Sequence, residues 1–303
     1  MNQMSRLFFL VLLILSVAPV GVAKNNGDNP DMKLSVEVTK EGYVGQPFEY
    51  RVLLTSSSPN IRDVRALRSP VVSPDCKTVR GSVANQKPEI KTVKGEKVYS
   101  WTVLRTFLIP KTAGKYEISS GDFIAFMPYE RFVNDFFWGQ RRVVDYEEVP
   151  LSCEKISFKV SDLPKNKPDN FSEGVGEFSV EGWFPPGEIV IGNNAIVVLK
   201  IEGYGNLENL KIPNVAKSFV NGCSLVNIEQ NDAVSQRNGR LYSEVTLTCT
   251  FVPQTDDGEI DPVNFVFFNP QKKKYETVSS KPLKWNINHK QENRKSSYDV
   301  MEI

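Results

Sequence analysis

Few residues of this sequence could act as a general base or as a metal ligand. The single histidine, His289, lies in the charged C-terminal segment, and a loose terminus cannot hold a base rigidly beside a nucleophile. The cysteines are too widely spaced for a zinc or CxxC redox motif. Asp256, Asp257, Glu259 and Asp261 could bind calcium, but they lack the spacing of a calcium loop and fit an ordinary acidic turn. We therefore predict no catalytic, cofactor-binding or metal-binding residues, and we expect that the protein is not an enzyme.

The four cysteines could form disulfides. Two of them fall in each half of the chain, and four cysteines allow three pairings. If the halves fold independently, the favoured pairs are Cys76–Cys153 and Cys223–Cys249, and an exported protein can keep such bonds. The alternative left open by the sequence is that some of these thiols are free and buried.

Residues 129–146 (YERFVNDFFWGQRRVVDY) are the best candidate for a binding site. Aromatic and arginine side chains dominate many protein–protein contacts, and this segment combines the two. Alternatively, the rings fold back over their own domain or pack against a second domain, since burial of aromatic surface is stabilising. We expect residues 131–138 to form a short helix. The candidate partner-binding residues are Phe132, Phe136, Phe137, Trp138, Arg141 and Arg142.

An internal repeat indicates which elements position this segment. Residues 34–37 (LSVE) return as residues 178–181 (FSVE), and Val44-Gly45 returns as Ile191-Gly192. Repetition at this spacing indicates two copies of one domain, each with its own core.

The two copies differ at one place. In the second copy, residues 265–270 (FVFFNP) turn through Lys272-Lys273-Lys274, which we predict to be a solvated hairpin turn. In the first copy, residues 123–128 (FIAFMP) lead instead into the aromatic segment 129–146. The shared parts account for the fold, so the unshared segment is where function is expected.

Short segments of alternating apolar and polar residues, such as 48–54 (FEYRVLL), indicate strands with one buried face. Strands and turns at this rhythm predict an all-β chain of two tandem immunoglobulin-like β-sandwiches, with about seven strands in each. The predicted divisions are a signal peptide (1–23), a first domain (31–160), a linker (161–174), a second domain (175–288) and a flexible tail (289–303).

The N-terminal segment is typical of a cleaved secretory signal. Arg6 precedes the uncharged run 7–17 (LFFLVLLILSV), and small residues lead to a cleavage site after Ala23. The apolar run is short for a membrane span, although an uncleaved anchor is the alternative. We expect a periplasmic protein whose mature chain has no transmembrane helix. Cleavage of the signal peptide removes Arg6 and leaves equal numbers of basic and acidic residues. The net charge of the mature chain therefore does not favour nucleic acid as a partner.

Four motifs resemble those of the BatD family of exported bacterial proteins. Residues 169–178 (DNFSEGVGEF) resemble the family's entry into a repeat, and residues 201–207 (IEGYGNL) resemble its strand and turn. Residues 265–275 (FVFFNPQKKKY) resemble its aromatic hairpin, and residues 135–142 (DFFWGQRR) resemble its aromatic excursion. The likeness covers nearly the whole mature chain. The sequence departs from the family pattern in having two repeats and no C-terminal membrane helix.

This resemblance implies a role but no catalytic residues. BatD proteins are associated with oxygen tolerance and are thought to act in the envelope beside von Willebrand A-type proteins. The expected function is therefore non-enzymatic protein–protein interaction in an envelope complex. The alternative is a carbohydrate-binding or adhesin-like module, which the fold alone does not exclude.

Overall fold

The computed structural model describes residues 31–83, 87–93 and 95–287, and this part of the chain is all-β, as predicted. It forms the strands β1 to β19 and one 3-10 turn (Val215–Ser218), without an α-helix. The predicted signal peptide and the whole of the predicted tail, including His289, lie outside the described residues.

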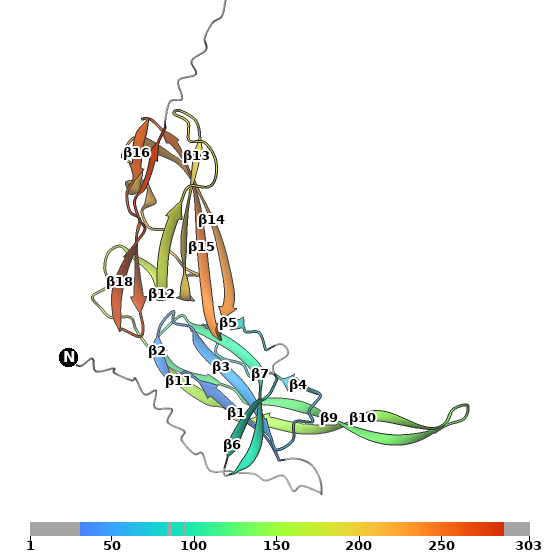
Figure 1. Ribbon diagram of the computed structural model, residues 1–303. Coiled ribbons are helices and arrows are strands. Elements are labelled where there is room, and N and C mark those ends of the chain that lie inside the picture. Colours follow the sequence, from blue (N-terminus) through green and yellow to red (C-terminus); the bar gives the residue numbers. More distant parts are fainter. Residues whose placement is uncertain (1–30, 84–86, 94, 288–303) are drawn as a thin grey trace, which may run out of the picture.

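The first half of the chain forms three sheets (Figure 1). One has the order β1-β3-β7-β5, with β6 also paired to β7, and the others are β10-β9-β4 and β2-β11-β8. The strands are β1 (Met32–Val38), β2 (Glu41–Tyr43), β3 (Phe48–Ser56), β4 (Asp63–Arg68), β5 (Cys76–Arg80), β6 (Glu89–Val93), β7 (Glu96–Pro110), β8 (Gly114–Ile118), β9 (Gly121–Asp135), β10 (Gly139–Cys153) and β11 (Ile156–Ser161).

The second half forms one large and one small sheet, with the orders β14-β15-β13-β12-β17-β18 and β16-β19. Its strands are β12 (Phe171–Trp183), β13 (Ala195–Asn206), β14 (Cys223–Arg237), β15 (Arg240–Pro253), β16 (Asp257–Ile260), β17 (Asn264–Asn269), β18 (Lys274–Ser279) and β19 (Leu283–Asn286).

The repeat in the sequence corresponds to a repeat in the strand order. The series β1-β3-β7-β5 of the first half matches β12-β13-β15-β14 of the second. Gly45 N–H donates a hydrogen bond to the Pro110 carbonyl at 2.9 Å, and Gly192 N–H donates to the Pro253 carbonyl at the same distance. Both glycines have a φ near +78°, in the left-handed region that favours glycine. The paired motifs Val44-Gly45 and Ile191-Gly192 are thus equivalent turns.

Each half has its own apolar core, and strand alternation explains why. On β3, Phe48, Tyr50, Val52 and Leu54 are buried, while the residues between them are partly exposed. The matching core of the second half is centred on fully buried side chains such as Phe251. Burying an aliphatic or phenyl side chain of this size contributes about 1.5–3 kcal/mol, so the alternating strands are the main source of stability.

The four cysteines are free, buried thiols, so both predicted disulfides are wrong. Cys223 on β14 lies opposite Pro253 of β15, and Cys249 is four residues before Pro253. That offset is about 13 Å along a strand, whereas a disulfide needs Cα atoms within about 7 Å. Cys76 lies on β5 opposite Pro110, while Cys153 lies on β10 of another sheet. Each thiol fills a place in a core instead.

The two halves contact each other through side chains on several strands. Leu241 of β15 is buried against Phe107 and Ile109 of β7. The Tyr43 ring meets the Phe268 ring edge-on, with centroids 4.9 Å apart. These contacts hold the second half against the first at the bend visible in Figure 1.

Candidate functional site

The segment 129–146 forms the far end of one long β-hairpin, and the predicted helix at 131–138 is wrong. Strands β9 and β10 pair without interruption from Gly121–Cys153 at the base to Asp135–Gly139 at the end. Residues 136–138 form the turn, and Gly139 follows with a φ of +69°. A left-handed glycine after a three-residue loop is a common way to close a hairpin. Local charge and aromatic content did not reveal this pairing, but the position of Gly139 could have.

The hairpin extends well beyond the sheet that supports it. Strand β4 pairs with β9 only from Asp122 to Phe126, and the last loop contact is the Asn60 side-chain amide donating to the Pro128 carbonyl at 3.3 Å. From Tyr129 onward the described strands pair only with each other. At about 3.3 Å per residue, this arm from Tyr129 to Asp135 is roughly 20 Å long. Figure 1 shows it extending away from both halves.

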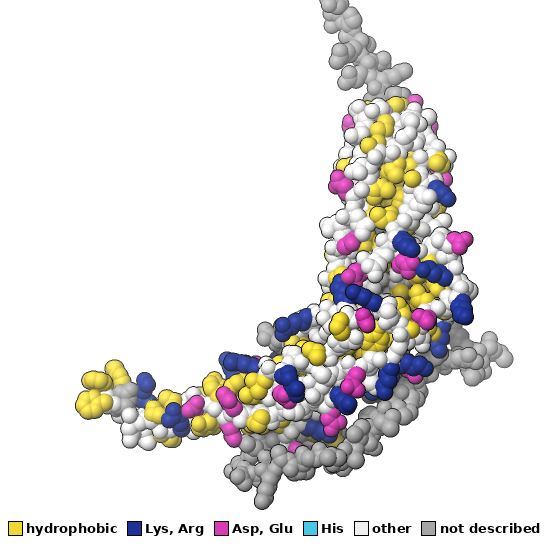
Figure 2. Space-filling view, turned by 180° about the vertical axis from the view of Figure 1, so that it is seen from behind, with side chains coloured by type: hydrophobic (Ala, Val, Ile, Leu, Met, Phe, Trp, Pro, Cys, Tyr) yellow, Lys and Arg dark blue, Asp and Glu magenta, His cyan; other side chains and the backbone are white. Residues whose placement is uncertain are grey.

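The end of the arm carries three exposed aromatic rings. Phe136 is 95% exposed, Phe137 is 83% exposed and Trp138 is 76% exposed. The two phenyl rings meet edge-on with centroids 5.2 Å apart. The rings therefore do not fold back as a lid over either half, and Figure 2 shows hydrophobic side chains gathered at the end of the arm. We call Phe136, Phe137 and Trp138 the aromatic tip.

Charged pairs lie along the arm below the aromatic tip. The Arg131 guanidinium is 2.9 Å from a carboxylate oxygen of Asp145, and the Arg142 guanidinium is 2.7 Å from one of Glu130. The pKa of Asp145 is lowered by the backbone N–H of Tyr146 and then by Arg131. These cross-strand pairs fix the arginines to the ribbon and support its strand pairing.

The hairpin register brings the predicted site residues to different faces. Phe132 lies directly opposite Arg142, so these two share one face, whereas Arg141 lies opposite Val133 on the other face. The aromatic tip stands beyond both. The sequence prediction missed the exposed apolar side chains of the arm itself, of which Val144 is 57% exposed. Val144 is two residues from Arg142 on the same strand, and alternate residues of a strand share a face, so Val144 lies on the face of Phe132 and Arg142.

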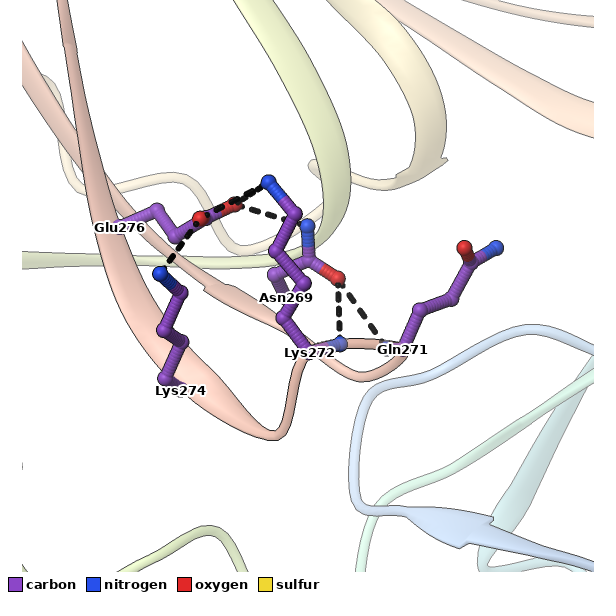
Figure 3. Close-up of polar contacts among 5 residues, drawn as sticks. All are labelled: Asn269, Gln271, Lys272, Lys274 and Glu276. Carbon is purple, nitrogen blue, oxygen red and sulfur yellow. Dashed lines mark hydrogen bonds and ion pairs between the residues drawn. The ribbon is translucent and has the colours of Figure 1, made fainter. Parts of the chain in front are cut away.

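The equivalent turn in the second half has a different character, shown in Figure 3. Strands β17 and β18 form a hairpin closed by the lysine triplet, as predicted. The side chains of Lys272 and Lys274 both point to Glu276, with N–O distances of 3.0 and 3.3 Å, and they lower its pKa, Lys272 most. The Asn269 side chain accepts hydrogen bonds from the N–H groups of Gln271 and Lys272 at 3.1 Å. Contacts among its own residues thus stabilise this turn, which carries lysines where the first half carries aromatic rings. The aromatic tip is therefore specific to the first half.

The acidic turn predicted near residue 257 is held by neutral and basic partners. Asn221 donates to Asp261 at 3.0 Å, Asn286 donates to Asp257, and Lys284 lies 3.3 Å from Glu259. A hollow of about 650 Å³ lies beside these residues. No group of three or more potential metal ligands occurs within residues 31–83, 87–93 and 95–287.

Comparison with known proteins adds no assignment. No family model matches the sequence, and no curated protein matches it. In the part of the chain that the structure describes, no helix is long and apolar enough to cross a membrane.

Proposed function

We propose that this chain is a non-enzymatic envelope protein that binds a partner protein through the aromatic tip of the β9–β10 hairpin. The observation that supports this most is the exposure of Phe136, Phe137 and Trp138 at the end of an arm that the other described strands do not cover. Soluble proteins rarely expose contiguous apolar patches unless they mark an interaction site. The resemblance to BatD proteins adds the setting: export to the periplasm, a von Willebrand A-type protein as the partner, and a link to oxygen tolerance.

The shape of the tip indicates what the partner must offer. Three rings on a tight turn make a convex, apolar end, which fits a concave apolar pocket. Large aromatic side chains that fill such pockets dominate binding energies, and each phenyl ring that is fully buried contributes about 1.5–3 kcal/mol. The paired charges lower on the arm would lie at the rim of this contact, where they orient the arm.

The carbohydrate-binding alternative needs open aromatic rings spaced along one sheet face. On the outer face of the large second-half sheet, Tyr204 and Tyr242 are covered by arginine side chains, with Arg237 centred 3.7 Å from the Tyr242 ring. Trp183 shares this face but lies six residues along the strands, about 20 Å away. A sugar chain would meet no two neighbouring open rings here, so we favour protein binding.

The test is the triple substitution Phe136→Ala, Phe137→Ala and Trp138→Ala. We expect it to abolish pull-down of the envelope partner and to leave thermal unfolding nearly unchanged, because the rings touch no core residue. The matched control is Leu67→Ala with Val71→Ala, two side chains 66% and 65% exposed outside the hairpin. Undiminished pull-down by the triple variant would contradict the proposal.

A further inference from the structure

The β9–β10 arm has an open edge as well as an aromatic tip. In the described sheet order β10-β9-β4, strand β10 is the outer strand, and its other edge pairs with no strand. An open edge of this length presents backbone N–H and C=O groups in a row, a ready template for another strand. A two-stranded ribbon alone is also only marginally stable in water, so the arm gains stability from a third strand.

The charges of β10 are complementary to those of a second β10 strand that runs in the opposite direction. Basic residues, Arg141 and Arg142, precede the middle of the strand, and acidic residues, Glu147 and Glu148, follow it. Val144 stands between the two groups and is exposed. In an antiparallel pair of identical strands, this order brings opposite charges together, which stabilises cross-strand pairs.

We propose that two copies of this chain pair through the open edges of β10, antiparallel and about a two-fold axis at Val144. The inference rests on the proposed function, because the same arm carries the aromatic tip, and it names a second copy as the partner of the arm's edge. Residues directly opposite each other in antiparallel strands have their side chains on the same face of the sheet. Two identical strands related by a two-fold axis meet this condition only if the axis passes between one residue and the same residue of the second copy. With the axis at Val144, Arg141 faces Glu147 of the second copy, and Arg142 faces Tyr146.

The neighbouring registers fit less well. An axis at Asp145 would set Arg142 opposite Glu148, but it would also set the Asp145 carboxylate against its own copy, and like charges directly opposite are destabilising. An axis at Val143 would set Arg141 opposite Asp145, a carboxylate that already binds Arg131 at 2.9 Å, and would leave Glu147 opposite Gly139. The axis at Val144 also places Pro150 opposite Trp138, at the end of the paired segment. A proline is tolerated there because its missing N–H interrupts no ladder.

The other long outer strand does not have this property. Strand β14 is also 15 residues long and lies at the edge of the large second-half sheet. It carries Glu229 and Asp232 but no basic residue before Arg237. Self-pairing of β14 about its middle, Gln230, would bring no opposite charges together. An axis at Ala233 would set Arg237 opposite Glu229, but it would pair only residues 229–237, so β10 is the edge better suited to a second copy.

A cysteine at the axis tests the register directly. In Val144→Cys the two copies place their Cα atoms about 4.5–5.5 Å apart, which a disulfide can span. The four native thiols are buried and should not interfere. We expect Val144→Cys to convert to a covalent dimer under mild oxidation. The control is Asn134→Cys, an exposed position on β9. In the proposed dimer both β10 strands lie between the two copies of residue 134, so this variant should stay monomeric on a non-reducing gel. Equal cross-linking of the two variants would overturn the proposal.

Charge reversal provides a second measurement that does not depend on an added thiol. In sedimentation equilibrium we expect the wild-type chain to have twice the mass of one chain. Arg141→Glu alone and Glu147→Arg alone should weaken the dimer, and the double variant should restore it, because the reversed charges face each other again across the axis. A monomeric wild type, or single reversals without effect, would overturn the dimer.

The two proposals fail separately. If Glu147→Arg is monomeric yet still captures the envelope partner, the tip acts without the dimer. If the wild type is dimeric and the triple-alanine tip variant captures the partner undiminished, the dimer stands and the proposed function falls.

Discussion

At the scale of single residues, the buried thiols show most clearly how strand register decides which side chains can bond to each other. Cys249 is fully buried in the core of the second half, and burial raises its pKa and that of Cys76 to about 11. Their number and even distribution favoured two disulfides, but a pairing depends on which residues face each other across strands. That register follows from long-range pairing, which cysteine spacing alone does not show.

Reduction should therefore leave stability unchanged. A native disulfide contributes about 2–4 kcal/mol, so its absence predicts the same melting temperature with and without a reductant. Thiol titration should find no reactive cysteine in the folded chain and four after denaturation. A clear fall in melting temperature on reduction would show that the cysteines are paired.

Alkaline pH should destabilise the protein through the same residues. An unfolded cysteine ionises near pH 9, whereas the folded Cys76 and Cys249 keep their protons to about pH 11. The unfolded state then binds fewer protons between these values, so stability is full below pH 9 and falls as the pH rises to 11. The loss is about 2 kcal/mol per thiol. Double substitution of both cysteines by alanine should flatten this part of the stability profile; parallel profiles would contradict the assignment.

At the scale of elements, the β9–β10 arm extends beyond the sheet that supports it. Its aromatic tip touches neither core, and from Tyr129 outward its strands pair only with each other in the described structure. The segment was identifiable from sequence because the two copies differ there. Its hairpin form was harder to predict, because the turn of residues 136–138 lacks the Asn-Gly or Asp-Gly signal of common hairpins and the signal in the sequence is Gly139.

Shortening the arm tests this independence. Replacing residues 130–144 by Asn-Gly joins the cross-strand pair Tyr129 and Asp145 with a favoured two-residue turn. We expect a melting temperature within a few degrees of the wild type, measured by circular dichroism, because no core contact is lost. Substantial unfolding would show that the arm supports the sandwich.

At the scale of the whole molecule, the repeat and the all-β class were predictable because alternation such as that of residues 48–54 reports one buried face. The contact between the halves was not predictable. It depends on Leu241, Phe107 and Ile109, which are adjacent only after both sheets have formed. Similarly, Ser82 N–H donates to the Gln236 side chain at 2.8 Å across a long stretch of sequence.

Leu241→Ala should weaken the contact between the halves. The side chain is 4% exposed, and such truncations cost about 2–5 kcal/mol. We expect calorimetry to show a lower melting temperature and a broader transition as the halves uncouple. The control Val234→Ala, 56% exposed on the neighbouring strand β14, should match the wild type. Identical transitions for the two variants would contradict this role of Leu241.

The central claim is that the aromatic tip contacts a partner protein, and site-specific photo-cross-linking at residue 137 tests it most directly. A photoreactive phenylalanine derivative replaces Phe137 in the full chain, and intact cells are irradiated. The account predicts a covalent adduct with one envelope protein, identified by mass spectrometry, and no such adduct when the same group replaces Leu67. Equal labelling from both positions, or no adduct from residue 137, would contradict it.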